Sequence, residues 1–136
     1  MSDIDATLAA AASGMRAQTL RMRIAAENVA NANSTGDSPG AEPFRRRIPL
    51  LESTTLADGV QGVQVMGAVP DQSAFRREYN PSHPAADASG YVRLPNVDTL
   101  VEMMDIRDAT RAYEANLNMI DAARSMTSRA LDLLRR

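Results

Sequence analysis

Apolar and small side chains recur at alternating steps of three and four residues along the C-terminal part of the chain, from Asn96 to Arg136. Such steps form a heptad pattern, which keeps one side of a helix against a partner helix. No Pro or Gly follows Asn96 to break a helix, so the pattern predicts one long helix over residues 96–136. The main row of contact positions is Ile106, Ala109, Tyr113, Asn116, Ile120, Ala123, Thr127, Ala130 and Leu134.

A second row of mostly small and apolar side chains follows the main row along the same predicted helix. A step of one residue turns an α-helix by about 100°, so the second row lies on a neighbouring side. A two-stranded coiled coil needs only one row, and we therefore expect contacts from more than one direction. The second row is Ala112, Ala115, Met119, Ala122, Met126, Arg129 and Leu133.

A matching pattern predicts an N-terminal helix from Ser2 to about Ala32. Ser2 and Asp5 have the spacing of a capping box. Gly14 costs this helix about 1 kcal/mol relative to Ala, unless a neighbouring backbone approaches it closely. The main row is Ile4, Leu8, Ala11, Met15, Gln18, Met22, Ala25, Val29 and Ala32, and the second row is Ala17, Leu20, Ile24, Asn28 and Asn31.

Between the two helices the apolar period changes from about 3.6 to two. Residues 31–36 predict the end of the first helix, with Asn or Gly in the left-handed conformation. A strand begins near Phe44, where Pro49 indicates an edge or a bulge, and Asp58-Gly59 indicates a hairpin turn before a valine-rich strand. Two further short strands are expected over residues 75–79 and 91–94.

These elements predict a mainly α fold with a small β-rich insertion. We expect the long N- and C-terminal helices to form an antiparallel coiled-coil hairpin. The expected divisions are an N-terminal helix and its cap over residues 1–35, a loop and β-rich insertion over 36–95, and a C-terminal helix over 96–136.

Composition and charge exclude several classes of function. The net charge is −2 and the chain has no Cys, so neither a strongly positive field for nucleic acid nor thiol chemistry is indicated. His83 is the only histidine, which leaves no His cluster for a metal site or a catalytic triad, and a hydrogen-bonded loop residue is the favoured interpretation. The sequence therefore predicts no catalytic residue, no cofactor and no metal site.

The remaining charged clusters also have structural interpretations. For Arg45, Arg46 and Arg47 we favour an edge strand protected by charge over an anion site. Asp105 and Asp108 are interpreted as a solvated face or as ion-pair partners of neighbouring arginines on the helix. No segment has the length and hydrophobicity of a membrane span, and no cleavable signal peptide is expected.

Several motifs resemble those of the bacterial flagellar axial proteins, which are the rod, hook and hook–filament junction subunits. The N-terminal motifs are SGM at residues 13–15 and AENVANANST at 26–35. Four later stretches narrow the resemblance to the proximal rod subunits of the basal body: YNPSHPAAD at 79–87, GYVRLPNV at 90–97, EMMD at 102–105 and RAYEAN at 111–116. Glu27 occupies a position where the family more usually has Asn, so we expect an altered contact there.

The resemblance implies a structural subunit of the proximal rod, in the periplasmic part of the basal body, whose terminal helices form a coiled-coil layer of the axial drive shaft. It also implies export by the flagellar type III apparatus without a cleaved signal peptide. The implied partners are further copies and other rod proteins, with no nucleic acid and no small-molecule substrate. The residues expected to carry assembly are Leu8, Met15, Met22, Asn28, Val29, Asn31, Ile106, Tyr113, Asn116, Met119, Ile120, Met126 and Leu134.

Three alternatives remain open at this stage. Another rod or hook subunit would share the helix patterns, although His83-Pro84 and Gly90-Tyr91-Val92 argue against it. A cytosolic coiled-coil adaptor would not require the β-rich insertion. An enzyme is disfavoured because no catalytic constellation is present in the sequence.

Overall fold

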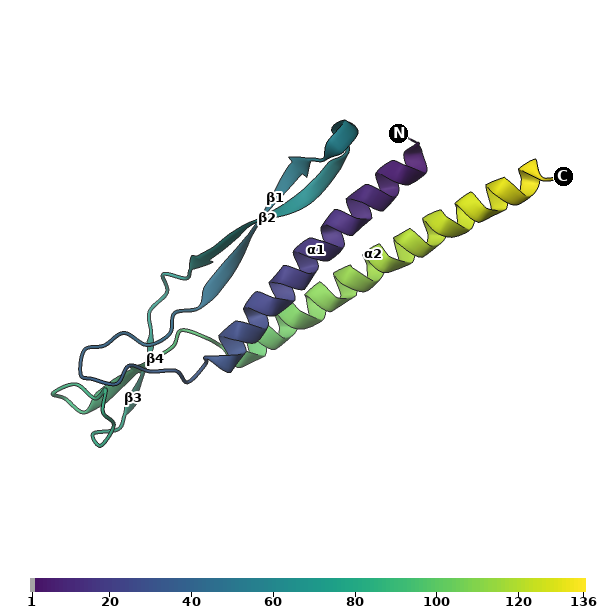
Figure 1. Cartoon of the computed structure of the whole chain (residues 1–136). Helices are drawn as coiled ribbons and strands as arrows, with labels where there is room; N and C mark the ends of the chain where they lie inside the picture. The colour runs from purple at the N-terminus through teal and green to yellow at the C-terminus, as the bar shows by residue number, and fades with distance from the viewer. Residues whose placement is uncertain (1) are drawn as a thin grey trace.

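A computed structural model describes residues 2–136 and shows an elongated molecule built on two long helices (Figure 1). Helix α1 spans Asp3–Ala30 and helix α2 spans Thr99–Leu134. The helices lie side by side and run in opposite directions, and the strands come from the segment between them. The prediction of a mainly α fold with a small β-rich insertion is confirmed.

The helix N-termini follow from their capping residues. The Ser2 hydroxyl accepts a hydrogen bond from the backbone N–H of Asp5 at 3.2 Å and donates one to the Asp5 carboxylate at 2.7 Å. Asp98 accepts from the backbone N–H of Leu100 at 3.0 Å and begins α2 in the same way. Each cap satisfies a helical N–H group that has no partner within the helix.

The prediction of a left-handed residue at the end of α1 is wrong. Asn31, the C-terminal cap, has φ −105° and ψ 14°, and Asp58 is the only non-glycine residue with positive φ in the described chain. The Asn31 side chain donates to the carbonyl of Glu27 at 2.8 Å. Because this bond and the Asn31 backbone N–H satisfy late carbonyls of the helix, no left-handed reversal is needed.

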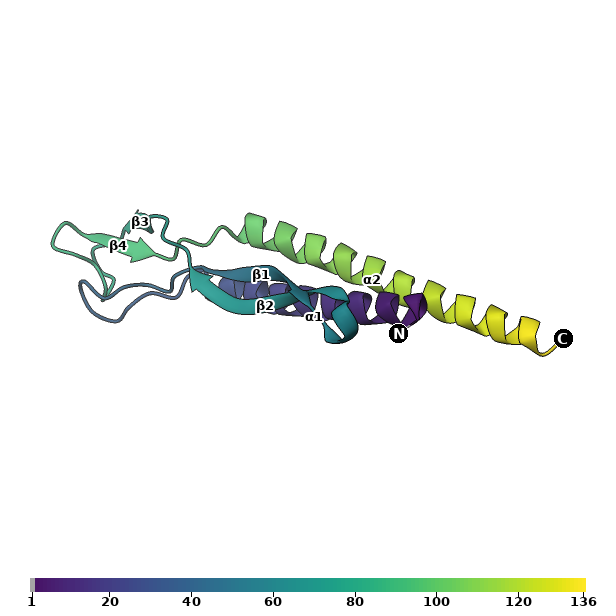
Figure 2. The ribbon, with the colours of Figure 1, turned by 90° about the horizontal axis from the view of Figure 1, so that it is seen from above.

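The larger β element is a hairpin that lies along α1 (Figure 2). Strand β1 spans Arg47–Thr55 and pairs antiparallel with β2, which spans Gln61–Pro70. Between them lies a short 3-10 turn, η1, over Ala57–Gly59, in which Asp58 and Gly59 have φ values of 60° and 78°. The predicted turn is confirmed, as is the edge position of Pro49, because β1 pairs with β2 alone and its register shifts after Leu50.

A second two-stranded sheet lies beyond the end of α1 at the far end of the molecule (Figure 1). Strand β3 spans Arg76–Tyr79 and pairs antiparallel with β4, which spans Tyr91–Leu94. Tyr79 and Tyr91 face each other across the sheet, with ring centroids 5.3 Å apart in an edge-on arrangement. Both strands coincide with the predicted segments to within one residue.

Small side chains form much of the buried core. Ala11, Ala17, Ala25, Ala109 and Ala123 are buried together with Ile24. Each alanine removes little apolar surface from water, at about 25 cal/mol per Å². The core is therefore thin and depends on close approach of the backbones that carry these residues.

Candidate assembly surface

Helix α1 is covered on one side by α2. Gly14 of α1 lies against Asn116 of α2, and a Cβ atom on Gly14 would come within 2.8 Å of the Asn116 Nδ2 atom. Closer to the C-terminal end of α1, on the same side, the Thr110 hydroxyl of α2 lies 3.4 Å from the Met22 sulfur. The close approach expected at Gly14 is therefore made by a side chain and not by a backbone.

The β1–β2 hairpin covers another side of α1. The Ser13 hydroxyl donates to the carbonyl of Ala10 at 2.7 Å and accepts from the backbone N–H of Val63 at 3.1 Å. Gly62 lies at this contact, where an added Cβ would come within 2.7 Å of the Ser13 Oγ atom. The second row of α1 is thus covered within the same chain, with Ala17 and Ile24 buried.

Helix α2 is covered mainly on the side that faces α1. Along its main row, burial or partial burial continues from Ile106 to Ala123. On the second row, Ala115 and Ala122 are exposed, and so are the larger side chains Met119 and Met126. From Ala115 to Met126 this row is an exposed apolar surface that no other element of the described chain covers.

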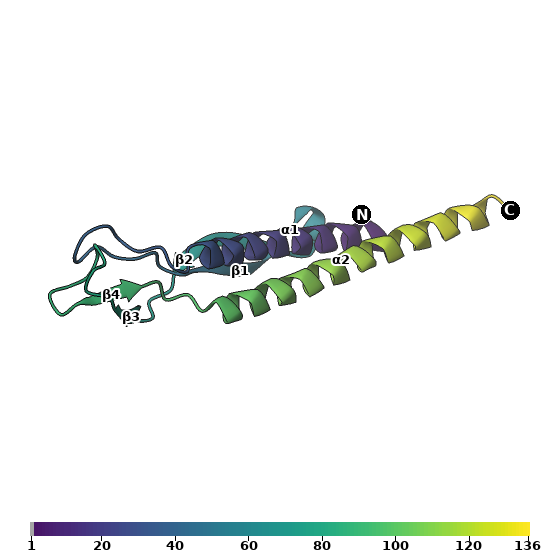
Figure 3. The same cartoon turned by 90° about the horizontal axis from the view of Figure 1, so that it is seen from below.

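The C-terminal end of α2 extends past the N-terminus of α1 (Figures 2 and 3). Helix α2 has 36 residues and α1 has 28, so at 1.5 Å per residue α2 is longer by about 12 Å. Every residue from Arg124 to Arg136 is exposed. The main row therefore continues through Thr127 and Ala130 with no partner in the described chain.

A shallow groove follows the two helices beside their contact. It is lined by Ala12, Met15, Arg16 and Thr19 of α1 and by Tyr113 and Ile120 of α2. Tyr113 is half-buried, so part of its ring contributes to the α1–α2 contact and part remains accessible from outside.

A polar junction joins both helices to the insertion. Arg46 precedes β1 and pairs with three carboxylates: Glu102, Asp71 at 3.2 Å and Asp105 at 3.4 Å. Glu102 is 1% exposed, and its other oxygen lies 3.3 Å from the Asn28 Nδ2 atom of α1. Every buried polar side-chain atom of residues 2–136 has a hydrogen-bond partner, as a buried charged group requires.

The junction corrects two predictions from the sequence. Arg46 does not protect an exposed edge, because its side chain is turned into the junction and is only 19% exposed. Asp105 pairs with Arg46 from the insertion and not with an arginine of its own helix. The spacing along one helix could not reveal a partner that lies 59 residues earlier in the chain.

Hydrogen bonds and charge shift the pKa values at this junction. The backbone N–H and hydroxyl of Ser73 bind the Asp71 carboxylate and, with the Arg46 guanidinium, hold the pKa of Asp71 below its usual range. Burial disfavours the charge of Arg46, but its bonds to Glu102 and Asp71 outweigh that cost and raise its pKa. Both shifts favour the charged forms of Asp71 and Arg46, so this pair acts as an ionic clamp at the junction.

Asn28 is the residue through which α1 holds the start of β1. Its side-chain oxygen accepts from the backbone N–H of Arg47 at 3.0 Å, and its Nδ2 atom donates to the Arg47 carbonyl at 2.9 Å. Glu27 lies 3.6 Å from the Arg23 guanidinium of the same helix and 3.9 Å from that of Arg47. Its half-exposed carboxylate therefore lies between an arginine of α1 and an arginine of the insertion.

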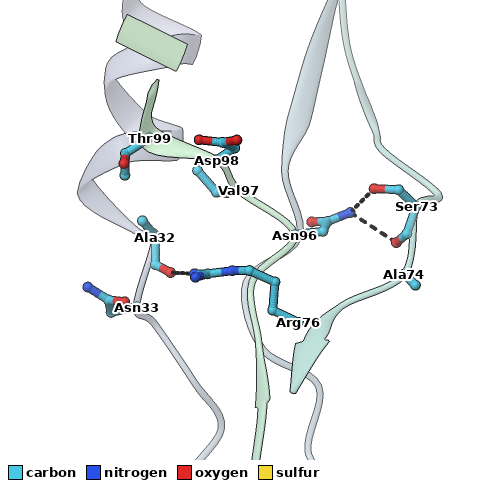
Figure 4. Close-up of a pocket in the computed structure, with 9 residues that line it drawn as sticks. All are labelled: Ala32, Asn33, Ser73, Ala74, Arg76, Asn96, Val97, Asp98 and Thr99. Atoms are coloured by element: carbon cyan, nitrogen blue, oxygen red, sulfur yellow. Dashed lines mark hydrogen bonds between the residues drawn. The ribbon is translucent and has the colours of Figure 1, made fainter. Parts of the chain in front are cut away.

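A cleft of about 580 Å³ lies between the end of α1, the start of α2 and the β3 region (Figure 4). Its polar groups bind one another: Arg76 donates to the Ala32 carbonyl at 3.1 Å, and Asn96 donates to the carbonyl and hydroxyl of Ser73 at 3.1 Å. His83 lies in the neighbouring loop and accepts from the backbone N–H of Ala85 at 3.0 Å, as expected for a hydrogen-bonded loop residue. Within residues 2–136 no cluster of potential metal ligands is present.

The predicted assembly residues fall into three groups. Asn28 is buried at the junction, and three residues are exposed: Met119, Met126 and Leu134. The others are half-buried on the two helices: Leu8, Met15, Met22, Val29, Asn31, Ile106, Tyr113, Asn116 and Ile120.

Two residues with structural roles were not predicted from the sequence. Ser13 accepts a hydrogen bond from the hairpin, and Glu102 pairs with Arg46 in the polar junction. Ser13 directly precedes the small Gly14 on α1, but nothing in the sequence identified β2 as its partner. Glu102 was quoted only as part of a motif, and its role depends on Arg46 from a distant segment.

Comparisons with known proteins place these features in a family. Residues 88–133 match the family described as "Flagellar basal body rod FlgEFG protein C-terminal". The chain is 43% identical over 136 residues to the flagellar basal-body rod protein FlgC of Agrobacterium fabrum, covering 99% of this chain and 98% of that protein.

More distant relatives have the same description. Identity is 38% over 133 residues with FlgC of Aquifex aeolicus, covering 97% of this chain and 98% of the relative. It is 35% over 124 residues with FlgC of Salmonella typhimurium, covering 90% and 92%. Because the similarity includes both helices and the insertion, this chain belongs to the FlgC family of flagellar basal-body rod proteins.

Proposed function

We propose that this chain, a structural subunit of the flagellar basal-body rod, assembles by packing the exposed sides of its helices against neighbouring subunits. Its own α1 and α2 form an antiparallel coiled-coil hairpin, and the insertion lies outside the helical layer. The single observation that carries the proposal is the exposed second row of α2, where Met119 and Met126 lie among small residues. A heptad-spaced apolar row without an intramolecular partner is typical of a helix that is completed by assembly.

The mechanical role follows from the kind of contact. Small side chains let helices approach closely, and each contact contributes little dispersion energy, but many together resist relative movement. A drive shaft that transmits torque requires this distributed rigidity. The half-buried Tyr113 is the largest side chain on the main row, and we assign it the role of packing anchor between α1, α2 and a neighbour in the adjoining groove.

The proposed location is the rod within the periplasmic space, close to its base. Export through the flagellar type III apparatus, without a cleaved signal peptide, accounts for how the chain reaches it. The partners are other copies of the chain and other rod proteins, with no cofactor or small-molecule substrate. Within residues 2–136, neither α1 nor α2 is long and apolar enough to cross a membrane.

The direct test is to delete the gene, restore it with this sequence and image purified basal bodies. We expect rods to be missing in the deletion strain and to contain the chain after restoration. Normal rods in the deletion strain, with the chain remaining in the cytosol, would instead support the adaptor alternative.

A matched pair of variants tests the surface that carries the proposal. Ala122→Arg places a charge on the exposed second row of α2, and Ser128→Arg places one about 120° around the same helix, also at an exposed position. Because neither residue is buried within the chain, both variants should fold. We expect Ala122→Arg to lower incorporation into basal bodies at least severalfold and Ser128→Arg to leave it near the unmodified value. Equal incorporation of both variants contradicts packing through the second row.

A further inference from the structure

The two strands of the β1–β2 hairpin differ in how their outer edges are protected. An unpaired strand edge presents backbone N–H and C=O groups that can pair with another chain, and proteins block such edges with charge, Pro or a bulge. Strand β1 contains Arg47, Pro49 and Glu52, and its register shifts after Leu50. Strand β2, over Gln61–Pro70, has no charged residue, and its only Pro is its last residue. The outer edge of β2 therefore depends on another form of protection.

Helix α1 protects this edge through one hydrogen bond. In an antiparallel pair, every second residue directs its N–H and C=O groups away from the partner strand. The Val63 N–H donates to the Ser13 hydroxyl at 3.1 Å, so Val63 belongs to the set that points away from β1. Gln61 and Val65 lie two residues to either side in the same continuous register, and their backbone groups point the same way. We call the Ser13–Val63 bond the latch.

The composition of β2 favours pairing with another strand. Val63, Val65 and Val69 have the β-branched side chains that are enriched in strands. Val63 and Met66 are 38% and 55% exposed, so apolar surface remains accessible beside the edge. Position against α1, and not sequence, is what keeps this strand from a second partner.

The base of the hairpin is held to α1 more firmly than the half near the turn. At the base, the Asn28 side chain makes two hydrogen bonds to the backbone of Arg47. Beside the latch, a cleft of about 260 Å³ lies between the hairpin and α1, with Ala17 and Val65 in its lining. The hairpin lies along α1 as a strap (Figure 2). Because segments with few close contacts open at the lowest free energy, the half near the turn is expected to open first.

We propose that the outer edge of β2 is a concealed pairing site for the same edge of a second copy, and that the latch keeps this site closed. Two β2 strands related by a two-fold axis can pair antiparallel, because β2 has no charge that would face its own copy. Opening of the half near the turn exposes the edge, and the two hairpins then form one four-stranded sheet. The latch is thus an autoinhibitory contact that prevents association through the insertion.

This pairing requires neither a contact of α2 nor an assembled rod, so it is tested with the purified full-length chain. Ser13→Ala removes the acceptor of the Val63 N–H and places a good helix former in α1. Thr19→Ala is the matched control, because the exposed Thr19 hydroxyl donates to the carbonyl of Met15 on its own helix, at 3.0 Å. Hydrogen exchange at Val63, followed by NMR, should become at least about fivefold faster in Ser13→Ala, as expected for the loss of one hydrogen bond. In Thr19→Ala it should stay near the unmodified rate.

Sedimentation velocity measures the pairing itself, and Ser13→Ala should raise the dimer fraction severalfold over that of the unmodified chain. Met66→Lys, at an exposed position near the midpoint of β2, should abolish this increase when added to Ser13→Ala, because like charges then meet across the pair. Ser53→Lys, at an exposed position of β1, is the matched control and should retain the increase. Ala122→Arg, on the second row of α2, should also retain it.

The results separate the latch, the pairing site and the rod function. Equal exchange rates at Val63 in Ser13→Ala and Thr19→Ala contradict the latch. Faster exchange without additional dimer overturns the concealed pairing site. Additional dimer that persists with Met66→Lys but disappears with Ala122→Arg assigns the association to α2 and also overturns the site. The rod function is decided independently, by imaging of basal bodies.

Discussion

Helices α1 and α2 have similar sequence patterns but different surroundings. Both carry two rows of small and apolar residues on adjoining sides. On α1, α2 covers one side and the β1–β2 hairpin covers the other, as the contacts at Gly14 and Ser13 show. On α2, only the row facing α1 is covered, and Met119 and Met126 of the second row are exposed.

The difference shows what a two-sided helix pattern specifies. A second apolar row indicates that a helix needs a second partner, but not whether the same chain provides it. For α1 the partner is the insertion, fixed by Asn28 and Arg46. For α2 no such element exists in the described chain, so a neighbouring subunit is the proposed partner.

The largest effect is expected where the insertion is fixed to the helices. Glu102→Ala removes a buried carboxylate and leaves Arg46 without its most buried partner. Breaking such a pair costs about 3–5 kcal/mol, so we expect a loss of about 3 kcal/mol in urea unfolding and faster hydrogen exchange in β1 and β2. Asp105→Asn, at a carboxylate that is 42% exposed, is the control and should cost less than about 1 kcal/mol. Equal losses for the two variants would show that burial of Glu102 is unimportant.

The next effect compares the covered row of α1 with the uncovered row of α2. Gly14→Val places a branched side chain against Asn116, and we expect a loss of about 1–3 kcal/mol in the free energy of unfolding, as for other overpacked contacts. Ala122→Val on the exposed second row should change it by less than about 0.5 kcal/mol.

A second-site change tests the cause. Asn116→Ala removes the side chain that Gly14→Val would strike, so the double variant should recover much of the loss. If the double variant is no more stable than Gly14→Val alone, the lost stability comes from the backbone of α1 and not from its contact with α2. Chemical denaturation of the four proteins gives the required cycle.

The regular parts of the fold could be predicted from the sequence because each depends on local signals. Heptad spacing gave both helices, and Asp58-Gly59 gave the hairpin turn. The β3 and β4 strands were also predicted, since short alternating runs flank a loop rich in Pro. In each case the signal and the element occupy the same short segment.

The junction could not be predicted because its partners are distant in sequence. Arg46 meets Glu102 and Asp71 only after the chain has folded, and a run of three arginines, taken alone, favours a charged edge. At the end of α1 the position was predicted correctly, but the conformation of the cap was not, because local signals there allow two outcomes. Asn31 can adopt a left-handed conformation, but its side chain bonds the Glu27 carbonyl instead, and propensity alone does not choose between these outcomes.

A smaller effect on stability is expected at the boundary between the two helices. Tyr113→Ala removes a half-buried ring that lines the groove with Met15 and Ile120. We expect a loss of about 1–2 kcal/mol, below the range for a fully buried aromatic residue, with weaker rod assembly and motility at unchanged synthesis. Tyr113→Phe keeps the ring and should retain both properties. Full motility with normal rods in Tyr113→Ala would contradict the role of packing anchor.

The smallest effect concerns how stability depends on pH through the Arg46–Asp71 ion pair, which helps to hold the β1–β2 hairpin beside α1. Hydrogen bonds from Ser73 and the charge of Arg46 lower the pKa of Asp71 in the folded chain. A carboxyl group with a lowered folded-state pKa stabilises the fold above its unfolded pKa, near 4, and loses that contribution as the pH falls through the folded value. Asp71→Asn should therefore reduce stability at neutral pH and flatten its decrease in acid, whereas Asp121→Asn, at an exposed position of α2, should leave the profile unchanged. Thermal unfolding between pH 7 and about pH 3 measures this dependence. If the melting temperatures of the unmodified chain and Asp71→Asn fall in parallel as the pH is lowered, other carboxylates are responsible for the loss of stability in acid.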